Sequence, residues 1–101
     1  MTPNYVFADE AVLDLECISD AIATFVSEDA VATFLRKVQE KCRRTAKFPN
    51  MGKNYSDIDP NLQGLIIDNY IILDFPRSDG IDIARVVNGY SDLESLSIGQ
   101  S

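Results

Sequence analysis

The strongest constraint on the fold of this chain is a pair of helical stripes joined by almost no linker. The first stripe begins near Asp9 and predicts a helix of about 16 residues. Its apolar members, spaced by three and four, are Ala11, Leu15, Ile18, Ile22 and Phe25. The second stripe follows Ser27, a helix-capping residue, and runs to about Ala46. Its members are Val31, Phe34, Leu35, Val38 and Cys42. Because only Val26 and Ser27 separate the stripes, the two helices should form an antiparallel hairpin.

The remaining chain has the pattern of a sheet. Pro49 and Gly52 end the helical half, and β-branched and aromatic residues then gather in short runs between turn residues. Strands are predicted at 62–67, 70–75 and 81–88, with a short first strand at 5–7. Asp68 and Asn69 tolerate positive φ and predict a tight two-residue hairpin. Residues 76–80 form the next predicted turn.

The element order β-α-α-β-β-β predicts an α+β fold of two layers, in which the helical hairpin packs on an antiparallel sheet. The chain has 101 residues, which is room for one domain. We expect that domain to span residues 1–97, with a helical turn at 91–96 and a flexible tail at 98–101.

Composition excludes several kinds of chemistry. The chain has no histidine and two cysteines, which removes Ser-His and Cys-His catalysis and two-histidine zinc sites. Cys17 and Cys42 both fall within helical patterns, so we expect two reduced and largely buried thiols. We expect no metal and no cofactor. No apolar run approaches bilayer length and no signal peptide is evident, which predicts a cytoplasmic protein without membrane contact.

Charge is segregated along the chain. The formal net charge is −7, yet residues 36–53 carry seven bases and one acid, whereas residues 1–35 carry seven acids and no base. The bases are Arg36, Lys37, Lys41, Arg43, Arg44, Lys47 and Lys53. Two interpretations remain open for them: a cationic binding patch, or a solvated helix face whose charges complement the helix dipole.

Several short motifs resemble one family in their order and spacing. They are Ala11, Asp14-Leu15 and Ile18, then 46–53 (AKFPNMGK), then Tyr70-Ile71-Ile72, then 83–89 (IARVVNG) and Asp92-Leu93. Together they resemble the RelE/ParE superfamily of toxins from bacterial type II toxin–antitoxin systems, over nearly the whole chain. The resemblance implies a small toxin that is held silent by a cognate antitoxin, whose acidic or amphipathic tail folds on binding.

The family divides by target. RelE-like toxins cut messenger RNA in the ribosome with basic residues and a tyrosine, and here only Lys53, Arg85 and Tyr90 could serve. An arginine is usual near Gln63 in that branch, and the bases usual after the last strand are missing after Gly89. We therefore favour a ParE-like chain that inhibits DNA gyrase by binding and is not an enzyme. The alternatives are a RelE-like endoribonuclease and a non-toxic, antitoxin-binding relic.

The resemblance also suggests a contact surface for the target or the antitoxin. Its expected members are Arg36, Lys41, Arg44, Lys53, Tyr55, Arg85 and Tyr90. Operator DNA would be bound only through the antitoxin, because this chain is acidic. Three of these interpretations have a structural alternative. Arg85 could instead form a salt bridge with Asp74 or Asp82, Tyr90 could cap the sheet, and Tyr55 could pack at the core edge beside a solvated Lys53. Asp14 is expected to be a solvated acid.

Overall fold

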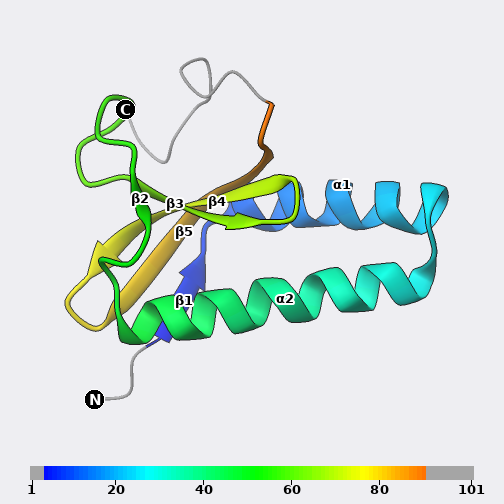
Figure 1. The fold of residues 1–101 in the computed structure, drawn as a ribbon, viewed down its shortest axis with the longest axis horizontal. Coiled ribbons are helices and arrows are strands. Elements are labelled where there is room, and N and C mark those ends of the chain that lie inside the picture. The colour runs from blue at the N-terminus through cyan, green and yellow to red at the C-terminus, as the bar shows by residue number, and fades with distance from the viewer. Residues whose placement is uncertain (1–3, 91–101) are drawn as a thin grey trace.

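In the computed structural model, the described residues are 4–90. They form two helices and five strands in the order β1-α1-α2-β2-β3-β4-β5. The helices lie against one face of the sheet, and this arrangement confirms the predicted α+β class (Figure 1). The expected helical turn at 91–96 and the tail at 98–101 lie outside the described residues.

The helical hairpin forms as predicted. α1 (Asp9–Phe25) and α2 (Glu28–Lys47) run side by side and in opposite directions (Figure 1). Ser27 begins the second helix, because its side-chain oxygen accepts a hydrogen bond from the Ala30 amide at 3.0 Å. Glu28 and Asp29 in the first turn, and Arg44 and Lys47 in the last, match the direction of the helix dipole.

The sheet has the strand order β1-β5-β4-β3-β2. Its strands are β1 (Asn4–Phe7), β2 (Lys53–Asn54), β3 (Gln63–Ile67), β4 (Tyr70–Arg77) and β5 (Gly80–Asn88). β3, β4 and β5 form the predicted antiparallel meander, and β1 joins its far edge parallel to β5. The two-residue β2 adds a strand that the sequence pattern did not predict, paired with the beginning of β3.

The two turns of the meander differ from each other in how well they were predicted. Asp68 adopts a φ of 52°, as expected for the tight hairpin between β3 and β4. Pro76, by contrast, lies within β4 and pairs with Ile81, although the sequence placed it in a turn. A proline is tolerated there because β3 ends its pairing with β4 at Asp74, so that side of β4 needs no further amide donor.

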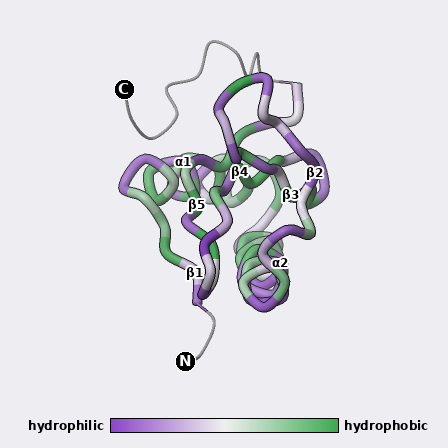
Figure 2. Tube along the Cα trace, turned by 90° about the vertical axis from the view of Figure 1, so that its left-hand side faces the viewer, coloured by the Kyte–Doolittle hydropathy of each residue, from purple (hydrophilic) through white to green (hydrophobic). Residues whose placement is uncertain are grey.

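Both faces of the sheet are covered. The helix side holds the larger core cluster, formed by Ala11, Phe34, Val38, Cys42, Leu65, Ile67, Ile72, Ile81, Ile83 and Val86. The opposite side holds a second cluster, formed by Leu62, Ile71, Leu73, Ala84 and Val87 with Tyr55, Ile58 and Phe75 packed on it. α2, seen nearly end-on in Figure 2, carries both hydrophobic and hydrophilic residues around its turns, as a helix covering one face requires.

Two residues expected in the core are exposed. Phe25 has 84% of its surface exposed, because the hairpin extends beyond the sheet and no described segment covers its tip (Figure 1). Cys17 is exposed as well, since it lies two residues after Leu15 and so falls off the buried stripe. Cys42 is buried, as predicted.

Candidate binding surface

Five bases on α2, four of them exposed and Lys41 half-buried, lie along one flank of the helix beside the edge of β3. We call them the basic flank: Lys37, Lys41, Arg43, Arg44 and Lys47. Three of them, spaced by four and three residues, line one hollow of about 260 Å³. The lining residues are Lys37, Glu40, Lys41, Arg44, Ile66, Ile67 and Asp68. This hollow lies where α2 meets the edge of β3.

The basic flank continues toward the end of α2, where it meets apolar side chains. A second hollow, of about 450 Å³, is lined by Glu40, Arg43, Arg44, Lys47 and Phe48. A third, of about 390 Å³, includes Lys47, Phe48 and Met51. Phe48 and Met51 are 61% and 51% exposed. Since neighbouring hollows share lining residues, charged and apolar side chains follow one continuous path along α2.

Lys37 is the one member of the basic flank with an ion pair in residues 4–90. Its Nζ lies 3.2 Å from Asp68 Oδ1, and both side chains are about half exposed. Lys41 and Arg44 have no carboxylate within ion-pair distance in that part of the chain. They are therefore the two cations of this hollow that can receive an external carboxylate or phosphate.

Lys53 and Tyr55 lie together beside β2. The Lys53 Nζ is 5.5 Å from the centre of the Tyr55 ring, a cation–π arrangement. The ring packs directly on Gly64, where a β-carbon would lie 2.5 Å from Tyr55 Cε2, and it joins the second core cluster. Tyr55 therefore packs at the edge of the core, as the structural alternative predicted. Lys53 remains exposed beside it.

Arg85 forms an ion pair with Asp14 on α1, and not with Asp74 or Asp82 as the sequence suggested. Its Nε donates to Asp14 Oδ2 at 2.7 Å. Both side chains are less than one fifth exposed, so Asp14 is not the solvated acid we expected. The bond to Asp14 raises the pKa of Arg85, with burial opposing it. Asp82 instead binds Arg77.

The physical reason for this pairing is a bulge. Arg85 pairs with Leu73 while Ile83 pairs with Asp74, so β5 has one extra residue, Ala84, between them. A bulge bends its strand and re-aims the side chains beside it. The sequence held one signal for Asp14, because it lies three residues after Ala11 and so falls within the apolar stripe of α1.

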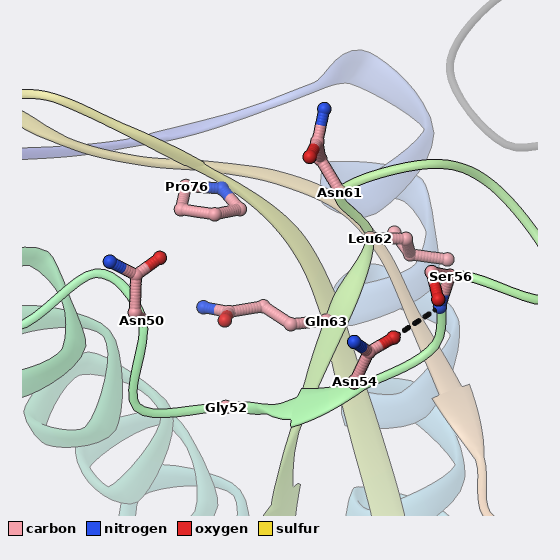
Figure 3. A pocket seen from close by; sticks show the side chains of 8 residues that line it. All are labelled: Asn50, Gly52, Asn54, Ser56, Asn61, Leu62, Gln63 and Pro76. Carbon is pink, nitrogen blue, oxygen red and sulfur yellow. Dashed lines mark hydrogen bonds between the residues drawn. The ribbon is translucent and has the colours of Figure 1, made fainter.

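Gln63 is a structural residue in this chain. It is 6% exposed, and its Nε2 donates to Asp74 Oδ1 at 3.0 Å and to the Pro49 carbonyl. In Figure 3 its amide points toward Asn50 across a polar hollow of about 370 Å³. These bonds connect β3 to β4 and to the segment after α2. Asp74, an acid within an apolar run, was the sequence signal for a buried partner.

Burial raises the pKa of two side chains in this part of the core, Asp74 and Cys42. Burial raises the pKa of Asp74 to about 7, and the hydrogen bond from Gln63 partly opposes that shift. Burial also raises the pKa of Cys42 to about 12, with the charge of Asp74 adding to it. Asp74 Oδ2 and Thr45 Oγ1 are buried without a hydrogen-bond partner among the described residues. Thr45, Asp74 and Cys42 are all fully buried in the core.

Tyr90 is the most exposed of the large hydrophobic residues in the described part of the chain, at 90%. Its amide donates to Asn88 Oδ1 at 2.8 Å, and the preceding Gly89 amide donates to the Asn69 carbonyl at 2.7 Å. The ring therefore projects from the end of β5 instead of covering the sheet, which excludes the capping role.

The structure brings together only some of the residues expected in a site. Lys41 and Arg44 share a hollow with Lys37, and Lys53 lies on Tyr55. Arg36 is exposed on α2 outside these hollows. Lys53 and Arg85 belong to strands three positions apart in the sheet, about 14 Å at ordinary strand spacing. Ile66, which sequence reasoning did not single out, lies at the hollow and is 57% exposed.

Residues 4–90 contain neither a metal-binding cluster nor a membrane-spanning helix. No group of three or more cysteine, aspartate or glutamate side chains there is arranged to hold a metal ion. Neither of the helices in that range combines the length and the apolar character that crossing a membrane requires.

Comparison with known proteins identifies the family. The model of the ParE toxin of the type II toxin–antitoxin system parDE matches residues 5–92. The chain belongs to the ParE toxin family. No curated protein sequence matches this ParE-family chain.

Solved structures agree with the family in fold. A chain described as "Chromosomal ParDE TA system from P. aeruginosa" is 15% identical and superposes with a TM-score of 0.70. The match covers 84% of the ParE-family chain and 94% of the other. At that identity the likeness concerns the fold alone.

Proposed function

We propose that this ParE-family chain is a toxin that arrests growth by binding DNA gyrase in the cytoplasm, and that a cognate antitoxin neutralises it. The family match over residues 5–92 supports the toxin assignment. The choice of gyrase rests on the resemblance to the ParE-like branch and on the state of the residues that a nuclease would need.

Two of the positions that a nuclease would use are engaged in structural bonds. Gln63, where RelE-like chains usually have an arginine, is neutral and buried against Asp74. Arg85 is held by Asp14, and Lys53 lies about three strand spacings away from it. RNA cleavage needs an acid, a base and cations around one phosphate. This arrangement supports a toxin that acts by binding instead of cleavage.

We propose that five residues of the expected surface make the external contacts. The exposed Arg36, Lys53 and Tyr90 contact the target. The antitoxin contacts Arg44 together with the half-buried Lys41. Tyr55 and Arg85 have a different role: Tyr55 supports Lys53, and Arg85 holds α1 on β5. Among the exposed residues, Tyr90 has a large aromatic ring that takes no part in core packing. This exposure favours Tyr90 as a target contact.

The test is induction of the chain alone in bacteria, with parallel pulse labelling of DNA and protein, followed by a supercoiling assay with purified gyrase. The proposal predicts growth arrest with falling DNA synthesis, sustained translation and inhibited supercoiling. Collapse of translation would favour the ribosome-dependent nuclease. Normal growth with abundant soluble protein would contradict toxicity and leave a non-toxic binding relic.

Two variants sharpen this test. Tyr90→Ser should abolish the arrest without changing the yield of folded protein, because the ring is almost fully exposed. Phe25→Ser removes another exposed aromatic ring, at the end of α1, and serves as the matched control. Equal toxicity of both variants would exclude Tyr90 as the contact.

A further inference from the structure

The outer edge of β3 is open beside the basic flank. β2 pairs with β3 only at Gly64 and Gln63, and no strand covers β3 beyond them among the described residues. The Leu62 carbonyl accepts a hydrogen bond from the Tyr55 amide on that outer side. Because backbone groups alternate sides along a strand, Gly64 and Ile66 also direct their N–H and C=O outward. Among the described residues, no strand pairs with the outward N–H and C=O of Ile66.

The side chains around this edge favour one kind of partner. The Ile66 side chain is 57% exposed and lies, like that of its partner Ile71, on the face away from the helices, whereas Lys41 and Arg44 line the hollow on the helix side. The basic flank has five cations, and the acids lining its hollows are Glu40 and Asp68, of which Asp68 already pairs with Lys37. This open strand edge therefore has an exposed apolar side chain on one face and, among the described residues, two unpaired cations on the other.

We infer that an extended acidic peptide segment docks here as an added strand along β3. Its backbone pairs with the N–H and C=O of Ile66, continuing the line of β2, and its carboxylates face Lys41 and Arg44. An apolar side chain of the segment covers Ile66. The inference deepens the proposed function, on which it rests for the identity of the partner, because the neutralising antitoxin is the protein that would supply the segment.

A nucleic acid fits these observations less well. Phosphates would satisfy Lys41 and Arg44, but they would not satisfy the outward N–H and C=O of Ile66 in the spacing of a strand. They would also leave the exposed Ile66 side chain uncovered. A peptide backbone with alternating side chains satisfies all three features together.

The test uses a synthetic fluorescent peptide of about seven residues that alternates glutamate and valine, with capped ends. Binding to the full chain is measured by fluorescence anisotropy, and hydrogen exchange of the backbone amides locates the contact. We expect the Ile66 amide to exchange quickly in the free chain and to become protected on binding. Binding should weaken as salt rises, because Lys41 and Arg44 are solvent-accessible.

Two pairs of variants separate the contributions. Lys41→Glu with Arg44→Glu should weaken binding about tenfold or more, whereas Arg36→Glu, on α2 outside the hollows, should change it less than about twofold. Ile66→Pro removes the outward amide and should abolish strand pairing, which an edge strand tolerates without unfolding. Ile66→Thr keeps the amide and the β-branched shape, so it should retain most of the binding.

The peptide-binding experiments can succeed or fail independently of the growth and gyrase assays. Protection at Ile66 together with loss in Ile66→Pro supports the docking edge, even if the gyrase assay is negative. Equal weakening by Arg36→Glu and by the Lys41/Arg44 pair, with no protection at Ile66, would reduce the binding to non-specific attraction and overturn the inference. Absence of binding, or binding of the peptide as a helix, would overturn it as well.

Discussion

Asp14 on α1 and Arg85 on β5 are joined by two hydrogen bonds, from Nε to Oδ2 at 2.7 Å and from the terminal Nη2 to Oδ1 at 3.0 Å. The same Asp14 Oδ2 accepts the backbone amide of Val86 at 2.9 Å. β1 stops pairing with β5 at Ile83, so this carboxylate takes over a backbone donor that no strand satisfies. One side chain therefore fixes α1 to the sheet edge and closes part of that edge.

Replacing Asp14 should destabilise the protein. Asp14→Ala leaves the partly buried Arg85 without its carboxylate and the Val86 amide without an acceptor, which should cost about 2–4 kcal/mol. Urea unfolding measures the loss, and the exposed Glu16→Ala on the same helix should stay within about 0.5 kcal/mol. If the double variant with Arg85→Ala shows no coupling between the two sites, the ion pair is not the cause.

Stability should fall as pH rises because of Asp74. Its folded-state pKa of about 7 lies above the ordinary value of 3.8, so the folded state holds the proton more tightly than the unfolded state. The loss therefore develops between about pH 4 and pH 7 and is complete above that range, on the order of 2–4 kcal/mol.

Asp74→Asn should remove this part of the pH dependence, because the amide is neutral and can still accept the bond from Gln63. We expect the variant to gain stability over the parent at pH 8 and little at pH 4, measured by urea unfolding at both values. The control Asp57→Asn removes an exposed carboxyl and should leave the slope unchanged. A parent whose stability rises from pH 4 to pH 8 would contradict the prediction.

The two thiols should react very differently. Cys17 is exposed and should react with a thiol reagent in the folded state, whereas Cys42 is buried and its pKa is raised to about 12. Mass spectrometry after labelling should show one rapid modification at neutral pH and a second only in denaturant. Cys17→Ser should abolish the rapid one, and rapid labelling that persists in this variant would show that Cys42 is accessible.

Two phenylalanines of the helical hairpin should differ in their contribution to stability. Phe34 is 4% exposed and packs against Tyr70, with ring centres 5.2 Å apart. Phe34→Ala should therefore cost about 3–5 kcal/mol. Phe25→Ala at the exposed tip should cost less than about 0.5 kcal/mol. Thermal unfolding of both variants measures the difference, and similar losses would show that the tip is packed in solution.

The sequence by itself determined both helices, four of the five described strands and their order. The two apolar stripes, the cap at Ser27 and the short connection at Val26 required the helical hairpin, because such signals depend on neighbours within a few residues. The positive φ of Asp68 was predictable for the same reason. The basic flank was also visible, as a cluster of charge along one segment.

The tertiary structure alone decided which distant groups meet. The partner of Arg85 depends on a bulge at Ala84 and on a helix 71 residues away, and neither leaves a local signal at Arg85. The exposure of Phe25 depends on where the sheet ends, because a helical stripe continues whether or not a surface covers it. The open edge at Ile66 exists because the chain before Lys53 leaves β3 early, and strand pairing is set by contacts between segments and not within them.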